Sequence, residues 1–249
     1  VAVLSADDLP PARRFADAFG AQTARLGIHL ALPLATAGAI AVAEGGEHAG
    51  RPVRWRVLAA ELADESPGGQ ERPVPLACPN LRILLDGESL DGHVSLRIAE
   101  IGRDASGGFQ ASPDFAPPCL RLGASPALTD VVRRMAEILV QRSDELARLR
   151  RSRTKGLVEF TASELGNQLM LGAINAHLPE LLAILGERAA HPHDAFRCLA
   201  ALCGQLLSFA DEGHPRDLPA YRHDDQLAGL RDLERRLRGL LTTVVTTRH

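Results

Sequence analysis

The sequence contains none of the short motifs that mark the common nucleotide-binding and hydrolytic enzymes. Its 249 residues include no P-loop, no G-x-G-x-x-G fingerprint and no G-x-S-x-G nucleophile elbow. The sequence has only four cysteines, and no two of them have the C-x-x-C spacing of a structural zinc site: Cys78, Cys119, Cys198 and Cys203. We therefore expect a reduced, cytosolic protein with no cofactor and no metal, and the interpretation moves away from an enzyme.

Aromatic residues are also scarce, and the net charge is low. Aromatics make up 4% of the chain and the formal net charge is -3, so we expect neither a base-stacking surface nor an overall attraction to nucleic acid or anionic membrane. The longest uncharged run, residues 30–43, is too short to span a bilayer and is interrupted by Pro33 and Gly38. The N-terminus lacks a secretory signal and an initiator Met, which predicts that the chain begins inside a domain.

Residues 1–124 show the two-residue period of β-strands. Apolar side chains alternate with others at 26–32, 53–57, 81–85 and 94–98, where Val94, Leu96 and Ile98 are expected on a buried face. Glycine-containing turns separate these stretches, and residues 61–73 are interpreted as a surface loop of low order. Short strands with no long helix between them predict a partial antiparallel β-sandwich or barrel.

Residues 125–249 show the helical period instead. Ser125 and Pro126 have the N-cap and first-turn positions of a helix of about 25 residues. A second helix is predicted over 160–185, where Thr161 and Glu164 have the form of a capping box and Pro179 should introduce a kink. Two further helices are predicted over 193–210 and 224–245. The short connections predict a four-helix bundle, and hence a chain with a β domain followed by an all-α domain.

An apolar stripe lies on the first predicted helix, beside the exit from the strands. Its spacing is close to a heptad repeat, which suggests packing between protomers or between domains. Packing inside a single bundle is the commoner fate of such a stripe and remains the favoured alternative. The stripe consists of Leu128, Val131, Met135 and Ile138.

One group of histidines and aspartates could bind a metal. A His, a His-Asp dyad and a later Asp on a helical scaffold are similar to the metal sites of HD-type phosphohydrolases, with His191, His193, Asp194 and Asp224 as ligands. Both parts of this group stand at predicted helix starts, where such residues cap the backbone. Capping is therefore the favoured interpretation.

Two other clusters have equally plain explanations. Five cations follow the first helix, but no aromatics interleave them, so a solvated helix end is favoured over a nucleic-acid or phospholipid patch. The cluster consists of Arg148, Arg150, Arg151, Arg153 and Lys155. Ser163, Ser208 and Cys203 have no partner histidine in any motif, and Cys198 and Cys203 are expected to fill the helical core.

Several stretches together resemble a known family. They are LPL at 32–34, GHVSLRIAEI at 92–101, FAPPCLRLGASPAL at 115–128, ELGNQLMLGAINAHLPEL at 164–181 and LPAYRHDDQ at 218–226. Their order and spread resemble the TssK family, the type VI secretion baseplate subunits of bacteria. The resemblance implies a β-sandwich shoulder similar to siphophage receptor-binding proteins, a four-helix neck and a C-terminal head, assembled as a homotrimer.

The resemblance also implies a function without catalysis. The shoulder would join the baseplate wedge and the head would dock onto the inner-membrane complex, so we expect a cytoplasmic adaptor at the inner face of that membrane. This chain is expected to hold most of the shoulder and the neck, with the head absent. Its long first helix would keep two binding ends at a set separation and transmit load. A metal-dependent phosphohydrolase and a phage-like adhesin remain the alternatives.

Overall fold

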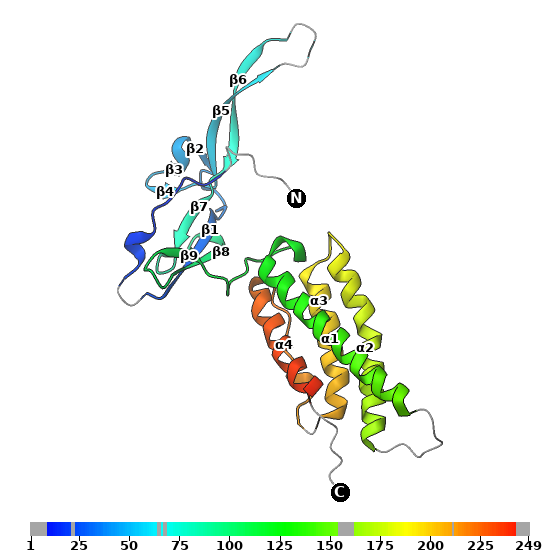
Figure 1. The fold of residues 1–249 in the computed structure, drawn as a ribbon. Helices are drawn as coiled ribbons and strands as arrows, with labels where there is room; N and C mark the ends of the chain where they lie inside the picture. Colours follow the sequence, from blue (N-terminus) through cyan, green and yellow to red (C-terminus); the bar gives the residue numbers. More distant parts are fainter. Residues whose placement is uncertain are drawn as a thin grey trace. The chain divides into compact units, whose positions relative to one another are not determined.

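The computed structural model describes residues 9–20, 23–63, 66, 69–153, 162–210 and 212–242. The chain divides into two compact units, Val1–Ser112 and Pro113–His249 (Figure 1). The described part of the first unit is rich in strands, and that of the second is helical. The predicted order of strands followed by helices is therefore confirmed. The division falls earlier in the chain than the predicted boundary between 1–124 and 125–249.

The larger sheet of the first unit has four strands in the order β7-β1-β8-β9. Its strands are antiparallel: β1 (Arg25–Pro33) lies between β7 (Arg82–Leu85) and β8 (His93–Arg103), and β9 (Phe109–Ala111) pairs with β8. One end of one face is buried by phenylalanines. This small core contains Phe19, Leu26, Ile28 and Leu85, with Phe15 packed against it.

The other end of this apolar face is open to solvent. Val94 and Leu96 of β8 pair with Leu32 and Leu30 of β1, yet they are 57% and 44% exposed. The expectation that Val94 and Leu96 are buried is therefore wrong. The pairing register between β1 and β8 shifts at Ile98. The phenylalanine-covered core lies on one side of this shift, and Val94 and Leu96 lie on the other, where no described residue buries them.

A second sheet consists of β2 (Val42–Ala43), β5 (Trp55–Ala63) and β6 (Glu71–Pro79), in that order. Strands β5 and β6 form a long hairpin, which Figure 1 shows extending well beyond β2. The loop predicted over 61–73 is thus partly wrong, because strand pairing continues through Ala63 and resumes at Glu71. The prolines of β6 are tolerated because β6 is an edge strand, whose outer backbone groups need no partner. A two-stranded ribbon, β3 (Glu47–His48) with β4 (Arg51–Pro52), completes this unit's described strands.

The second unit contains four long helices, α1 (Pro126–Arg153), α2 (Ala162–Gly186), α3 (Pro192–Leu206) and α4 (Gln226–Thr242). Each agrees with a predicted helix to within a few residues at the described ends. Helix α1 contacts α2 and α4, and α3 contacts the same two helices, so the four lie alongside one another around one core (Figure 1). The fully buried side chains of this core are mainly leucines from all four helices. Thr161 of the predicted capping box lies outside the described residues.

The residues between the strands and α1 belong to the helical unit. Ala116, Cys119 and Leu122 are buried in the helical core, and the Leu122 amide donates to the carbonyl of Ala190 at 2.8 Å. We call residues 113–125 the connector. Because it packs on the helices rather than on a sheet, the predicted boundary at residue 124 is displaced from the observed division.

Candidate functional site

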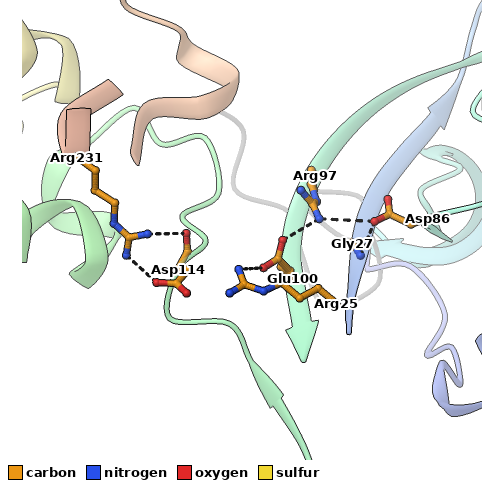
Figure 2. Close-up of polar contacts among 7 residues, drawn as sticks. All are labelled: Arg25, Gly27, Asp86, Arg97, Glu100, Asp114 and Arg231. Atoms are coloured by element: carbon orange, nitrogen blue, oxygen red, sulfur yellow. Dashed lines mark hydrogen bonds and ion pairs between the residues drawn. The ribbon is translucent and has the colours of Figure 1, made fainter. Parts of the chain in front are cut away.

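Two residues of α4 hold the connector by polar contacts. The Gln226 side chain accepts from the Cys119 amide at 3.0 Å and donates to the Cys119 carbonyl at 2.9 Å. Gln226 is only 1% exposed, so these bonds satisfy a buried amide side chain and a buried backbone together. One turn and a half later, Arg231 pairs with the Asp114 carboxylate at 3.0 Å, as Figure 2 shows. The start of α4 and the connector therefore form one polar junction within the helical unit.

A group of rings lies around this junction. Tyr221 is 4.7 Å from His193 between ring centroids, and the rings of His191 and His223 are stacked at 5.4 Å. Gln226 Nε2 also lies 2.9 Å from both Tyr221 Oη and His223 Nδ1. Burial raises the pKa of the Tyr221 phenol. The sequence had indicated these histidines but not the tyrosine and glutamine that hold them.

Two of the four candidate metal ligands form a helix cap. His191 is the N-cap of α3: its side chain accepts from the His193 amide at 3.0 Å, and the Asp194 carboxylate accepts from the His191 amide at 3.3 Å. Asp224 does neither; it forms an ion pair with Arg222 at 2.8 Å. The favoured capping interpretation is thus confirmed for His191 and Asp194, but it is wrong for Asp224.

The same four-residue motif occurs a second time with the same geometry. His214-Pro215-Arg216-Asp217 begins a short 3-10 helix, where His214 accepts from the Arg216 amide and Asp217 from the His214 amide. In both places the proline stands at the first helical position, where its missing N–H costs nothing. The repeat was visible in the sequence, and it would have identified H-P-x-D here as a cap.

The thiols of the helical core are not activated nucleophiles. Burial raises the pKa of Cys203 to about 12, and burial together with the nearby Glu180 carboxylate does the same for Cys198. Both thiols are therefore protonated at neutral pH. Of the predicted basic cluster, Arg148, Arg150 and Arg151 are exposed at the end of α1. The Arg153 side chain and Lys155 lie outside the described residues.

The predicted packing stripe lies inside the helical unit. Leu128, Val131 and Met135 are at most 1% exposed, and Ile138 is half-buried against the same core. They occupy the position that the favoured alternative described, the core of a single set of helices. Packing between protomers stays a prediction, and of the four only Ile138 keeps surface for it.

Helix α2 carries an exposed apolar stripe on the face opposite its core residues. Leu165 and Leu169 are 53% and 46% exposed, and small exposed residues continue the same face toward the end of the helix: Gly172, Ala176 and Ala183. By length and composition, Glu164–Gly186 would suffice to cross a membrane, but Ile174 and Leu181 on its other face are fully buried among the helices. We call this surface the α2 stripe; it is a feature of interfaces between helices.

Charged residues organise the second face of the larger sheet. Asp86 accepts from the Gly27 amide at 2.7 Å and lies 3.6 Å from Arg97, which pairs with Glu100 at 3.0 Å, as Figure 2 shows. Arg25 pairs with the other oxygen of Glu100 at 2.9 Å. Burial raises the pKa of the Asp86 carboxyl, but hydrogen bonds from His29 and Gly27 and the charge of Arg97 lower it more. The network joins β1, β8 and the turn after β7.

The sequence of this chain matches a known protein family along all of its 249 residues. A sequence model for bacterial type VI secretion proteins, the family of VasE, ImpJ and EvfL, matches residues 1–249. The chain belongs to this family.

Relatives of known role and structure agree with the family. The chain is 29% identical over 221 residues to the type VI secretion system baseplate component TssK1 of Pseudomonas aeruginosa, which is 88% of this chain and 49% of that protein. The chain thus spans about half the length of this curated relative. It is similar to a chain of a type VI baseplate complex (TM-score 0.84, 28% identity, 98% of this chain and 54% of that one). It is also similar to a chain of a TssK-TssF-TssG subcomplex (TM-score 0.78, 26% identity, 94% and 73%).

Two of the stretches that resemble the TssK family meet at the junction described above. FAPPCLRLGASPAL covers residues 115–125 of the connector and the start of α1, and LPAYRHDDQ ends in Gln226. The paired hydrogen bonds between Cys119 and Gln226 join these two stretches, which are separated by 107 positions. GHVSLRIAEI lies along β8 and supplies Arg97 and Glu100 to the charge network. The resemblance is thus carried by residues that hold the architecture together.

Proposed function

We propose that this chain is a structural component of the type VI secretion baseplate, with no catalytic activity of its own. The observation that carries the proposal is the similarity of 98% of the chain to a chain of a baseplate complex, at a TM-score of 0.84. The candidate catalytic groups have structural uses that support the same conclusion: His191 and Asp194 cap α3, and Cys198 and Cys203 are protonated thiols.

In this proposal the two units are the shoulder and neck of a TssK-like protein. The sheets form a β-sandwich similar to siphophage receptor-binding proteins, and the four helices form a four-helix bundle. The pairing of each helix with two neighbours supports the bundle. The sequence-based domains, the shoulder at 1–124 and the neck at 125–249, are kept in this proposal. Residues 113–124 of the connector come before the neck in the sequence but pack on its helices.

The neck would assemble three copies of the chain. The α2 stripe supports this step, because exposed leucines followed by small residues on one face let two helices approach closely and bury apolar surface. Ile138, at the margin of the core, could extend such a contact along α1. A homotrimer built in this way would leave the core residues Leu128, Val131 and Met135 inside each protomer.

The shoulder would meet the baseplate wedge, which in the related subcomplex includes TssF and TssG. The open end of the larger sheet supports this assignment, since Val94 and Leu96 of β8 pair with β1 yet expose apolar surface, and β9 pairs only with the far end of β8. The chain would thus act as a cytoplasmic adaptor at the inner face of the inner membrane. Its contact with the membrane complex would involve the head domain of the longer relatives.

Capture of baseplate subunits tests the proposal. The tagged chain, co-expressed with TssF and TssG of the same genome, should retain both through purification. Leu96→Glu places a charge on the open sheet and should reduce the retained TssF and TssG at least tenfold. Leu62→Glu, on a similarly exposed leucine of β5, is the matched control and should retain them. Failure of the wild-type chain to retain either protein would contradict the baseplate assignment.

A further inference from the structure

Three potential metal ligands of different chemistry converge between α2 and α3. His177 and Glu180 are one turn apart on α2, and Cys198 faces them from α3. A ring nitrogen, a carboxylate oxygen and the thiol sulfur all lie within 4.8 Å of one another. We propose that these three side chains form a Zn²⁺ site that joins α2 to α3.

The ligand types select the ion. Calcium and magnesium take oxygen ligands almost exclusively, whereas a set of one nitrogen, one sulfur and one oxygen suits Zn²⁺. Zinc bonds of about 2.0 to 2.3 Å require ligand atoms about 3.3 to 3.8 Å apart in a tetrahedron. The observed separations of up to 4.8 Å need to close by about 1 Å, which side-chain rotation of the exposed Glu180 can supply.

A neighbouring residue already orients the histidine for this role. His177 Nε2 lies 3.2 Å from Gln205 Oε1, so Nε2 carries the proton and donates it. In the proposed site the metal would bind through the lone pair of the other ring nitrogen, Nδ1. A hydrogen bond on the ring nitrogen that does not bind is the usual support of a histidine ligand.

Burial decreases across the site from one helix to the other. Cys198 is 3% exposed, His177 is half-buried and Glu180 is exposed. Three protein ligands on a partly open site leave a fourth position for water, and they let the ion enter and leave. Binding breaks the S–H bond of Cys198, forms a sulfur–zinc bond and releases the proton to solvent.

The site would reinforce α2 at the point where Pro179 interrupts its backbone hydrogen bonds. Pro179 lies between the two ligands of α2 and has no N–H to donate to the carbonyl four residues earlier. In the metal-free chain the Cys198 thiol donates to the carbonyl of His177 at 3.5 Å, a weak link between the two helices. Zinc would replace this link with metal–ligand bonds from both helices.

Cobalt titration of the purified chain, stripped of metal with a chelator, tests the proposal. Co²⁺ in this site should produce a thiolate-to-cobalt absorption band that saturates at one equivalent and disappears when Zn²⁺ is added. Cys198→Ser should abolish the band. Cys203→Ser is the matched control, because Cys203 is equally buried on the same helix and belongs to no such cluster of described residues; its band should be unchanged.

Two further variants keep the test decisive if Cys198→Ser does not fold. Glu180→Gln changes an exposed residue and should weaken Zn²⁺ binding at least about tenfold. His193→Ala removes a histidine of the α3 cap and should leave the band intact. The proposal is overturned if no band appears at one equivalent, if the band survives in folded Cys198→Ser, or if Glu180→Gln binds zinc as tightly as the wild type.

Discussion

Gln226 and Cys119 form a pair of hydrogen bonds that closes a loop of 107 positions. The glutamine side chain takes the place of a neighbouring strand: it accepts from the amide and donates to the carbonyl of the same residue. Because Gln226 is 1% exposed and Cys119 is buried, the connector backbone has no water to replace this partner. These two hydrogen bonds therefore fix the position of the connector backbone on α4.

Replacing Gln226 should destabilise the helical unit. Gln226→Leu leaves the buried amide and carbonyl of Cys119 unsatisfied, which should lower the free energy of unfolding by about 2 kcal/mol or more. Denaturant unfolding followed by the helical circular dichroism signal measures it. Gln141→Leu, on the exposed side of α1, should change it by less than about 0.5 kcal/mol. Equal stability of the two variants would show that the junction does not hold the connector.

The α3 cap gives a second stability prediction. His191→Ala removes the acceptor of the His193 amide and should cost about 1 kcal/mol, whereas His191→Asn keeps an acceptor and should cost less. Thermal unfolding of both variants, with His193→Ala as a control for the ring cluster, separates the effects. A similar loss in all three would point to ring packing rather than capping.

Acid should weaken the contact between α1 and α4. Burial raises the pKa of the Glu234 carboxyl, but hydrogen bonds and charge from Arg134 and Arg238 lower it more, so its folded pKa lies below the ordinary value. The ionised carboxylate therefore stabilises the fold above an unfolded pKa of about 4.3, and this stability is lost as the pH falls through the folded value.

Unfolding measured from pH 7 to 3 should show a smaller acid effect in Glu234→Gln than in the wild type. Glu145→Gln is the control, because the Glu145 side chain is 59% exposed and its pair with Arg142 should contribute little at any pH. An identical pH dependence in Glu234→Gln and the wild type would contradict the assignment.

Gly27 should tolerate no side chain. A Cβ at this position would lie 2.5 Å from Asp86 Oδ2 and 2.6 Å from Arg97 Nε, so Gly27→Ala forces the charge network apart. We expect a loss of about 1 to 3 kcal/mol in the sheet unit, measured by denaturant unfolding followed through Trp55 fluorescence. Gly102→Ala, on the paired strand, meets its nearest atom at 3.7 Å and should be close to neutral. The opposite ranking of the two variants would show that the network adapts.

Two of the exposed leucines of α2, one inside the α2 stripe and one outside it, test whether the chain assembles through the stripe. Leu169→Glu charges the α2 stripe and should shift the chain from trimer to monomer in light scattering. Leu182→Glu changes a leucine of almost equal exposure that lies outside the stripe, and it should leave the mass unchanged. A loss of trimer in Leu182→Glu but not in Leu169→Glu would place the interface elsewhere.

The helices could be predicted from the sequence because their signals are local. Ser125, Pro126 and the leucine period place α1 to within a few residues, and the same holds for the start of α3. Strand β6 was not predicted: its first residues were assigned to the loop at 61–73, and its prolines, Pro73, Pro75 and Pro79, are compatible with a strand only at the edge of a sheet. The burial of Val94 and Leu96 was predicted wrongly because a register irregularity leaves no trace in the alternating pattern.

The contacts of the candidate site join residues that are far apart in the sequence, so the sequence does not predict them. Nothing near Cys119 indicates that Gln226 will bind its backbone, and nothing near His177 indicates that Cys198 lies on the facing helix. The capping roles of His191 and Asp194, by contrast, follow from four adjacent residues. Local chemistry could be predicted, and pairings between elements required the fold.

The most direct measurement is the absolute mass of the chain after co-expression with TssF and TssG, by light scattering on a sizing column. The account predicts one peak that contains all three proteins, with a mass well above that of three 26.7 kDa chains. A chain that elutes alone at 26.7 kDa, with TssF and TssG in separate peaks, would contradict a structural role in the baseplate.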